Sequence, residues 1–343
     1  MNNAEPLVLD RPTAAGLQPL PFATDPRLDP QVITFLKGLN TGGPGLEMLT
    51  PLAARQVLAD AQAAVDVDLS GIEIRKMTIR QDGYKVPLHL VRPAGTAHQV
   101  LPVFMFVHGG GWVLGDFPTH QRMVRDLVVA SGYAAVFVNY TRTPDTHFPQ
   151  AIHEIYAATK WVAENGGAIG VDGQNLAVVG NSVGGNMSTV TCLLAKHYGG
   201  PKIKLQVLMW PLTNADVTTD SYQQFGQDRF LTTSLMEWMF DLYTTDPTER
   251  RLSTHSPLQA SAEELRDLPP ALIQVAENDV LRDEGEAYGR RLSASGVPAT
   301  TIRYNGMIHD FGLLNGLATL PATRSLFRHA AAELKHYLGK GQL

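Results

Sequence analysis

The fold is decided by residues 176–185, which read Leu-Ala-Val-Val-Gly-Asn-Ser-Val-Gly-Gly. The first four are apolar and predict a buried strand of a parallel sheet, and the proline-free stretch from Val183 to Tyr198 has the length of a helix. Between them, Ser182 occupies the sharp turn of a nucleophile elbow. Gly180 and Gly184 are needed there because a side chain at either position would clash as the helix packs on its strand. The pattern predicts a serine exposed for acyl transfer.

A second glycine motif lies upstream, where residues 108–112 read His-Gly-Gly-Gly-Trp directly after the apolar stretch 101–107. Backbone N–H groups of such a run can point at a developing oxyanion without side chains in the way. Each motif alone is a weak signal. Together, each behind a strand-like stretch and in this order, they indicate an enzyme of acyl transfer.

The acid and the histidine of such a site should follow downstream, in that order. Glu277, Asp279 and Asp283 come shortly after an apolar stretch, and His309 follows another strand-like segment. Catalytic groups of an open α/β sheet gather at strand ends like these. The remaining histidines in helix-like or strand-like stretches are more typical of packing or surface positions: His89, His197, His329 and His336.

Strands and helices alternate between residues 72 and 211, which predicts an α/β fold with a mostly parallel, doubly covered sheet. Two helices are expected before this region, at Pro30 to Leu39 behind the N-cap Asp29 and at Pro51 to Val65 behind the N-cap Thr50.

Between residues 212 and 268 the alternation stops, and no clear strand is visible in a stretch rich in aromatic residues. A segment this long inside a compact domain is usually a lid or a binding element. We therefore expect four parts: an N-terminal segment with cap helices (1–68), the catalytic domain in two pieces (69–211 and 269–343), and a cap insertion (212–268).

At this point the chain resembles the hormone-sensitive-lipase-like family of α/β-hydrolase carboxylesterases. Members typically show His-Gly-Gly-Gly, Gly-Asp-Ser-Ala-Gly-Gly, Asp-Pro-Leu-x-Asp-Glu and Ile-His-Gly-Phe motifs. The resemblance covers nearly the whole chain and includes Tyr140 and the pair Phe148 and Pro149. It implies an α/β-hydrolase fold in which the insertion and the N-terminal helices form one helical cap over Ser182.

The resemblance also implies roles for individual residues. Ser182 would be the nucleophile, with Asp279 and His309 as its triad partners. The oxyanion would be met by backbone N–H groups of Gly110, Gly111 and Val183, while the loop would be supported by His108 and Gly109.

Apolar cap residues should line the acyl or alcohol pocket, because small-molecule sites are concave and mostly apolar. The candidates are Trp112, Phe35, Phe225 and Trp238. No metal or organic cofactor is expected, since the glycine runs match neither the dinucleotide fingerprint nor the P-loop. His153-Glu154 also lacks the second histidine of a zinc helix.

Several positions depart from the family pattern. Asn181 stands where the family usually has Asp or Thr, Val183 where it has Ala, and Asp310 where Gly is common. None removes a catalytic atom, so the departures bear on substrate preference. Asp310 could raise the pKa of the neighbouring imidazole, although a solvated carboxylate that points elsewhere is the simpler expectation.

Composition agrees with a soluble enzyme. The 343 residues carry a formal charge of −5 without a Lys/Arg cluster, which argues against nucleic acid or an anionic membrane as partner. Residues 1–20 lack the apolar core of a signal peptide, and no stretch is long and apolar enough for membrane insertion. We therefore expect a cytoplasmic protein with a small ester substrate, and a homodimer is one assembly that the sequence allows.

Three other functions stay open. An arylesterase or lactonase specialist would share every motif. A serine peptidase of related fold would share the triad, but those enzymes generally carry a large extra domain for which this chain has no room. A non-catalytic small-molecule receptor on the same scaffold typically loses a triad member, whereas all three are present here.

Overall fold

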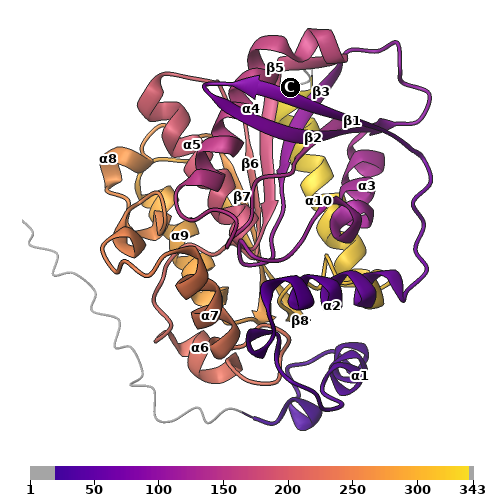
Figure 1. Ribbon diagram of the computed structural model, residues 1–343, viewed down its shortest axis with the longest axis vertical. Helices are drawn as coiled ribbons and strands as arrows, with labels where there is room; N and C mark the ends of the chain where they lie inside the picture. Colours follow the sequence, from indigo (N-terminus) through magenta and orange to yellow (C-terminus); the bar gives the residue numbers. More distant parts are fainter. Residues whose placement is uncertain (1–19, 340–343) are drawn as a thin grey trace, which may run out of the picture.

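The computed structural model describes residues 20–339 and has one eight-stranded sheet at its centre, with strand order β1-β2-β4-β3-β5-β6-β7-β8 (Figure 1). The strand β2 runs antiparallel to β1 and β4, and all other neighbours are parallel. The strands are β1 (Ile72–Gln81), β2 (Tyr84–Pro93), β3 (Leu101–Val107), β4 (Ala134–Val138), β5 (Val171–Asn181), β6 (Gln206–Met209), β7 (Ala271–Asn278) and β8 (Ala299–Ile308). The expected α/β-hydrolase architecture is confirmed.

Helices cover both faces of this sheet. One face carries α4 (Gln150–Asn165), α5 (Val183–Tyr198) and α9 (Arg282–Ala294), and the other carries α3 (Phe117–Ser131) and α10 (Pro321–Leu338). The strands divide their side chains accordingly. Along β3, Val103 and Met105 enter the core beneath α4 and α5, while Phe104 and Phe106 enter the core beneath α3 and α10. A strand buried on both faces is continuously apolar for this reason.

The two helices expected near the N-terminus are present as α1 (Pro30–Leu39) and α2 (Pro51–Ala63). Asp29 accepts a hydrogen bond from the backbone N–H of Gln31, and Thr50 accepts one from Ala53, so both predicted N-caps are confirmed. The second helix ends two residues before the expected end at Val65. The expectation of no signal peptide rests on residues that lie almost entirely outside the described part of the chain.

Residues 212–268 contain α6 (Asp220–Phe225), α7 (Thr233–Tyr243) and α8 (Ala262–Leu265) and no strand. In Figure 1, α1, α2, α6 and α7 gather in the lower part of the view. Contacts connect these segments: Asp25 pairs with Arg229 at 2.5 Å, and the Ser234 hydroxyl donates to Glu47 at 2.8 Å. Among residues 20–339, no helix is both long and apolar enough to cross a membrane.

Candidate active site

Ser182 lies at the turn between β5 and α5, with φ 55° and ψ −125°. This positive φ is rare for a residue other than glycine and is a strained conformation that a tightly packed turn can hold. The packing explains the flanking glycines. A Cβ on Gly180 would lie 2.2 Å from the carbonyl oxygen of Gly184, and a Cβ on Gly184 would lie 2.0 Å from that of Val107. The steric requirement predicted for both glycines is therefore present in the structure.

The three residues expected to act together are joined by hydrogen bonds. The Nε2 atom of His309 lies 3.1 Å from Oγ of Ser182, and its Nδ1 atom lies 2.8 Å from Oδ2 of Asp279. The second oxygen of Asp279 accepts the backbone N–H of Leu281 at 3.0 Å, which fixes the carboxylate. All three side chains are buried, and Ser182, at 5% exposure, is enclosed by the protein instead of exposed as the sequence pattern predicts. The geometry suits transfer of a proton from the hydroxyl to the imidazole.

Two opposing effects act on the charge of His309. Burial disfavours the imidazolium and lowers its pKa, but the carboxylates of Asp279 and Asp310 more than offset burial and leave the pKa above its ordinary value. Asp279 acts through both charge and its hydrogen bond. The histidine is thus poised to accept a proton.

The oxyanion loop follows β3. Gly110 and Gly111 have φ of 104° and 60°, conformations that favour glycine. Their N–H groups make no hydrogen bond to any of residues 20–339, and Val183, as the first residue of α5, has no intrahelical acceptor for its N–H. Because β3 and β5 are neighbouring strands, with Val107 paired to Gly180, this loop and the elbow lie side by side.

His108 is enclosed within the protein beside this loop. Its Nδ1 lies 2.8 Å from the carbonyl oxygen of Gly109, and its ring stacks on Tyr140 at 4.2 Å between centroids. The Tyr140 hydroxyl donates to the carbonyl oxygen of His108 at 3.0 Å. Burial holds the pKa of His108 well below its ordinary value, so the ring is neutral. These contacts brace the loop and hold His108 away from proton transfer.

The environment of Asp310 differs from the expected one, a carboxylate in water that points away from the histidine. Its side chain is not solvated: the residue is 5% exposed, and its Oδ1 accepts hydrogen bonds from Nδ2 of Asn181 at 3.0 Å and Nε1 of Trp210 at 2.7 Å. The prediction of a solvated carboxylate was wrong because these donors come from distant parts of the chain. Trp210, at the end of β6, carried no motif that could have identified it.

The other carboxylates after β7 lie elsewhere. Asp283 is in the first turn of α9, where it accepts the backbone N–H of Ser221 at 2.8 Å and pairs with Arg282 at 2.8 Å. Glu277 accepts the backbone N–H of Gly306 at 2.8 Å. Of the three candidates, Asp279 is the one bonded to His309.

The four residues expected in the pocket have different surroundings. Trp112 is fully buried and stacks on Tyr243 of α7 at 4.1 Å, while Trp238 is half-buried on the same helix. Phe35 of α1 is half-buried and packs against Gly316. The ring of Phe225 is also fully buried and is faced by three guanidinium groups, those of Arg27, Arg229 and Arg282.

One cap residue reaches the oxyanion loop directly. A Cβ on Gly111 would lie 1.9 Å from Sδ of Met239 in α7, so the thioether rests on the loop. Only the tertiary approach of α7 to the loop after β3 reveals the place of Met239 beside the candidate oxyanion site.

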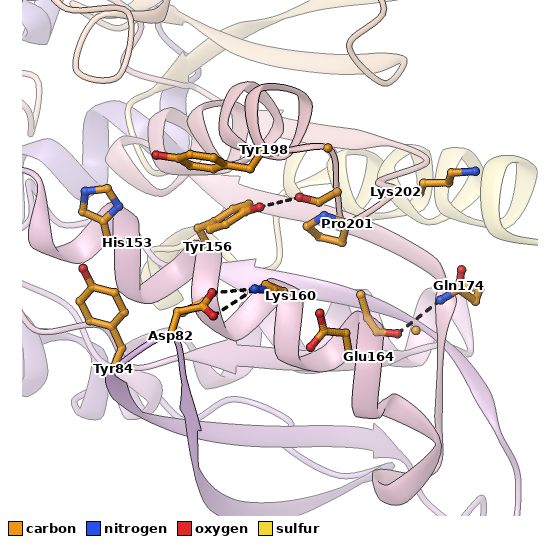
Figure 2. A pocket seen from close by; sticks show the side chains of 15 residues that line it. Asp82, Tyr84, His153, Tyr156, Lys160, Glu164, Gln174, Tyr198, Pro201 and Lys202 are labelled. Carbon is orange, nitrogen blue, oxygen red and sulfur yellow. Dashed lines mark hydrogen bonds and ion pairs between the residues drawn. The ribbon is translucent and has the colours of Figure 1, made fainter.

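A cavity of about 750 Å³ lies away from these residues (Figure 2). Its lining includes Tyr84, Tyr156 and the ion pair of Lys160 with Asp82. Gln174, near the amino end of β5, also lines it, whereas Ser182 follows the carboxyl end of that strand. The cavity and the Ser182 site are therefore at opposite ends of β5.

Comparisons with known proteins agree with this geometry. The family model for the α/β hydrolase fold matches residues 104–313. Among solved structures, a thermostable esterase from Pseudomonas putida is 56% identical and has a TM-score of 0.91, with 92% of this chain and 99% of that chain covered. An ethyl acetate hydrolase of Pseudomonas putida is 34% identical over 239 residues (67% of this chain, 73% of the relative).

A carboxylesterase of Mycobacterium tuberculosis is 33% identical over 275 residues, which cover 79% of this chain and 84% of the relative. The family-model match thus includes both glycine motifs, Asp279 and His309. The chain belongs to the α/β hydrolase fold family and, within it, to the hormone-sensitive-lipase-like carboxylesterases that its motifs resemble.

Proposed function

We propose that this protein is a serine carboxylesterase that hydrolyses short- to medium-chain, soluble carboxylic esters through an acyl-enzyme intermediate. One observation carries the proposal: Ser182, His309 and Asp279 form a continuous hydrogen-bonded relay beside unpaired backbone N–H groups. The esterase activities of the relatives support esters as the substrate class.

The relay generates the nucleophile. Nε2 of His309 takes the hydroxyl proton of Ser182 as Oγ attacks the ester carbonyl carbon, and the carbonyl π electrons move onto oxygen. Asp279 keeps the proton on Nδ1, so that Nε2 is free to accept, and stabilises the imidazolium that forms.

The oxyanion is stabilised by N–H groups of Gly110, Gly111 and Val183, which are oriented before the substrate arrives. When the tetrahedral intermediate collapses, the bond to the alcohol oxygen breaks and His309 gives its proton to that oxygen. A water molecule then attacks the acyl-enzyme by the same steps, and Ser182 leaves with the proton.

The cap is the second part of the proposal. Residues 1–68 and 212–268 would cover the catalytic domain formed by 69–211 and 269–343. The pairing of Asp25 with Arg229 and the packing of Met239 on Gly111 support this division. Of the pocket candidates, Trp112 is best supported because it adjoins the oxyanion loop; Phe35, Trp238 and Phe225 would shape the pocket from the cap.

A panel of p-nitrophenyl esters tests the function, with Ser182→Ala as the control. We expect hydrolysis of the soluble esters and a loss of about 10⁶ in kcat for the variant. A phosphonate inhibitor should label Ser182 alone. Activity of Ser182→Ala within tenfold of the parent would remove Ser182 from the mechanism. Because p-nitrophenyl esters are themselves aryl esters, alkyl esters and lactones assayed beside them test the specialist alternative, and cleavage of peptide anilides would indicate a peptidase.

Cytoplasmic location and a homodimer remain parts of the proposal. Cell fractionation and light scattering of the purified protein test them separately. A membrane-associated or exported protein would contradict the first, and a mass equal to one chain at micromolar concentration would contradict the second.

A further inference from the structure

Two departures from the family motifs, Asn181 before the serine and Asp310 after the histidine, contact each other. Nδ2 of Asn181 donates to Oδ1 of Asp310 at 3.0 Å, and Oδ1 of Asn181 accepts the backbone N–H of Gly109 at 3.0 Å. Trp210 donates to the same Asp310 oxygen. All of these side chains are buried. One chain of hydrogen bonds therefore joins the oxyanion loop, the elbow and the histidine loop.

The other carboxylate oxygen of Asp310 lies beside the reacting nitrogen. Its Oδ2 is 3.8 Å from Nε2 of His309, and that nitrogen is 3.1 Å from Oγ of Ser182. The side chains of His309 and Asp310 are 2% and 8% exposed, so water screens little of their interaction. A negative charge thus lies next to the atom that gains a proton when Ser182 is activated.

We propose that Asn181 and Asp310 act as one positioning pair for the esterase reaction. Asn181 holds the Asp310 carboxylate against the Nε2 side of His309 and fixes the Gly109 N–H of the oxyanion loop. Asp310 then stabilises the imidazolium from the side opposite Asp279. The inference rests on the proposed function, since it assigns a role only if His309 is the base.

The pair explains why Asn181 is an amide here. With Asp310 present, a carboxylate at position 181 would place two negative oxygens about as far apart as the present 3.0 Å hydrogen bond. The family usually has Asp or Thr before the serine, and Gly is common after the histidine. In this chain the carboxylate of the pair belongs to Asp310, after the histidine, and the residue before the serine is the neutral Asn181.

Among the described residues, Asp279 and His120 are titratable groups that face this site. Asp279 faces the opposite nitrogen of His309, and both carboxylates favour the protonated ring, although burial opposes it. His120 of α3 also senses the charge of Asp310, and burial lowers the pKa of His120 to about 4. His120 is therefore neutral across the pH range in which the base would titrate.

The first test is Asp310→Asn, which can keep the acceptor for Asn181 and Trp210 while it removes the charge. We expect the plateau of kcat/KM to fall about tenfold or more and its acid limb to move by about one pH unit toward lower pH, because the imidazolium loses a stabilising charge. A purely structural role would lower the plateau without moving the limb. Asp82→Asn, in the turn between β1 and β2, is the control for loss of one carboxylate and should change neither.

The second test reverses the pair. Asn181→Asp should lower kcat/KM about 100-fold, because two carboxylates at hydrogen-bond distance repel each other and displace the side chain that holds the Gly109 N–H. Adding Asp310→Asn should then restore at least about tenfold. The rescue is partial because Trp210 also donates to this atom of residue 310. In the double variant the amide nitrogen at position 310 faces the carboxylate at position 181, and a nitrogen that donates cannot accept the hydrogen bond from Trp210.

Thermal unfolding of each variant separates changes in kcat/KM from loss of the fold. If Asn181→Asp does not fold, the acid limb of Asp310→Asn alone tests the inference. An unmoved acid limb in Asp310→Asn overturns the inference, as does a double variant no better than Asn181→Asp when both fold. If either of these results is obtained and Ser182→Ala is inactive, the positioning role is refuted but the proposed esterase mechanism is not. An active Ser182→Ala would instead overturn the proposed function itself.

Discussion

Replacing Asp279 by Asn should change which nitrogen of His309 carries the proton. Oδ2 of Asp279 accepts the Nδ1 proton at 2.8 Å, and Oδ1 accepts the N–H of Leu281 at 3.0 Å. In Asp279→Asn the amide oxygen satisfies Leu281, so the amide NH₂ faces Nδ1. The neutral ring then carries its proton on Nε2, which faces Ser182 and can no longer accept from it.

The cost has two sources: the wrong tautomer and the loss of charge beside the imidazolium. Together they should lower kcat by about 10⁴, equivalent to about 5 kcal/mol in the activation barrier, with KM little changed. The assay is the pH dependence of p-nitrophenyl ester hydrolysis under saturating substrate. The unfolding temperature should stay close to that of the parent, because the amide keeps the size and the Leu281 contact of the carboxylate.

Asp283→Asn is the matched control. Its carboxylate also follows β7, but it accepts from Ser221 and pairs with Arg282 in the first turn of α9. Asp283→Asn should keep kcat within about threefold and lose about 0.5–1 kcal/mol of stability, since a charge at a helix N-terminus is removed. The reverse ranking of the two variants, with Asp283→Asn the more damaging to kcat, would refute the assignment of the acid.

Two further predictions concern the cap. Activity on p-nitrophenyl esters should rise from acetyl to butyryl or hexanoyl, at up to about 0.8 kcal/mol per buried methylene, and fall by dodecanoyl; rates still rising at palmitoyl, or seen only on emulsions, would contradict an enclosed pocket. Burial opposes the charge of Asp25, but hydrogen bonds from Arg27 and Arg229 lower the pKa of its carboxyl group to about 2. The contribution of this carboxylate to the free energy of unfolding is therefore present above about pH 4 and is lost as the pH falls toward 2. Asp25→Asn should therefore cost about 2 kcal/mol in urea unfolding at pH 7 and less at pH 3, and an equal loss at both pH values would contradict this account.

The catalytic strand–turn–helix unit could be predicted from sequence because its determinants are local. The bounds of α5 and of β3 agree with the expected ones, since α5 ends before the left-handed Gly199 and the apolar stretch of β3 ends before His108 and the glycine run. The start of β5 could not be predicted. Polar residues occupy 172–175, and Val171 joins the strand because it pairs with Leu101 across a register shift between Pro102 and Val103. Such pairing is visible only in three dimensions.

The relay was predictable for a related reason. Ser182, Asp279 and His309 each follow a strand, and parallel strands bring their carboxyl ends to one edge of the sheet, so order along the chain identified all three positions. The surroundings of Asp310 were not predictable in this way. A charged residue in a loop is ordinarily solvated, and nothing near it in sequence indicates otherwise.

Asp310 is buried because its two donors are far away in sequence, Asn181 by 129 residues and Trp210 by 100. Each motif departure, taken alone, removed no catalytic atom and therefore seemed to affect only substrate preference. Their contact changes that interpretation. A substitution at either position alters the partner of the other, and Asp310 lies within 3.8 Å of the nitrogen that accepts the serine proton. Residues that flank catalytic residues in this fold should therefore be compared as spatial pairs, because a change that is neutral in one motif can be compensated or penalised by the other.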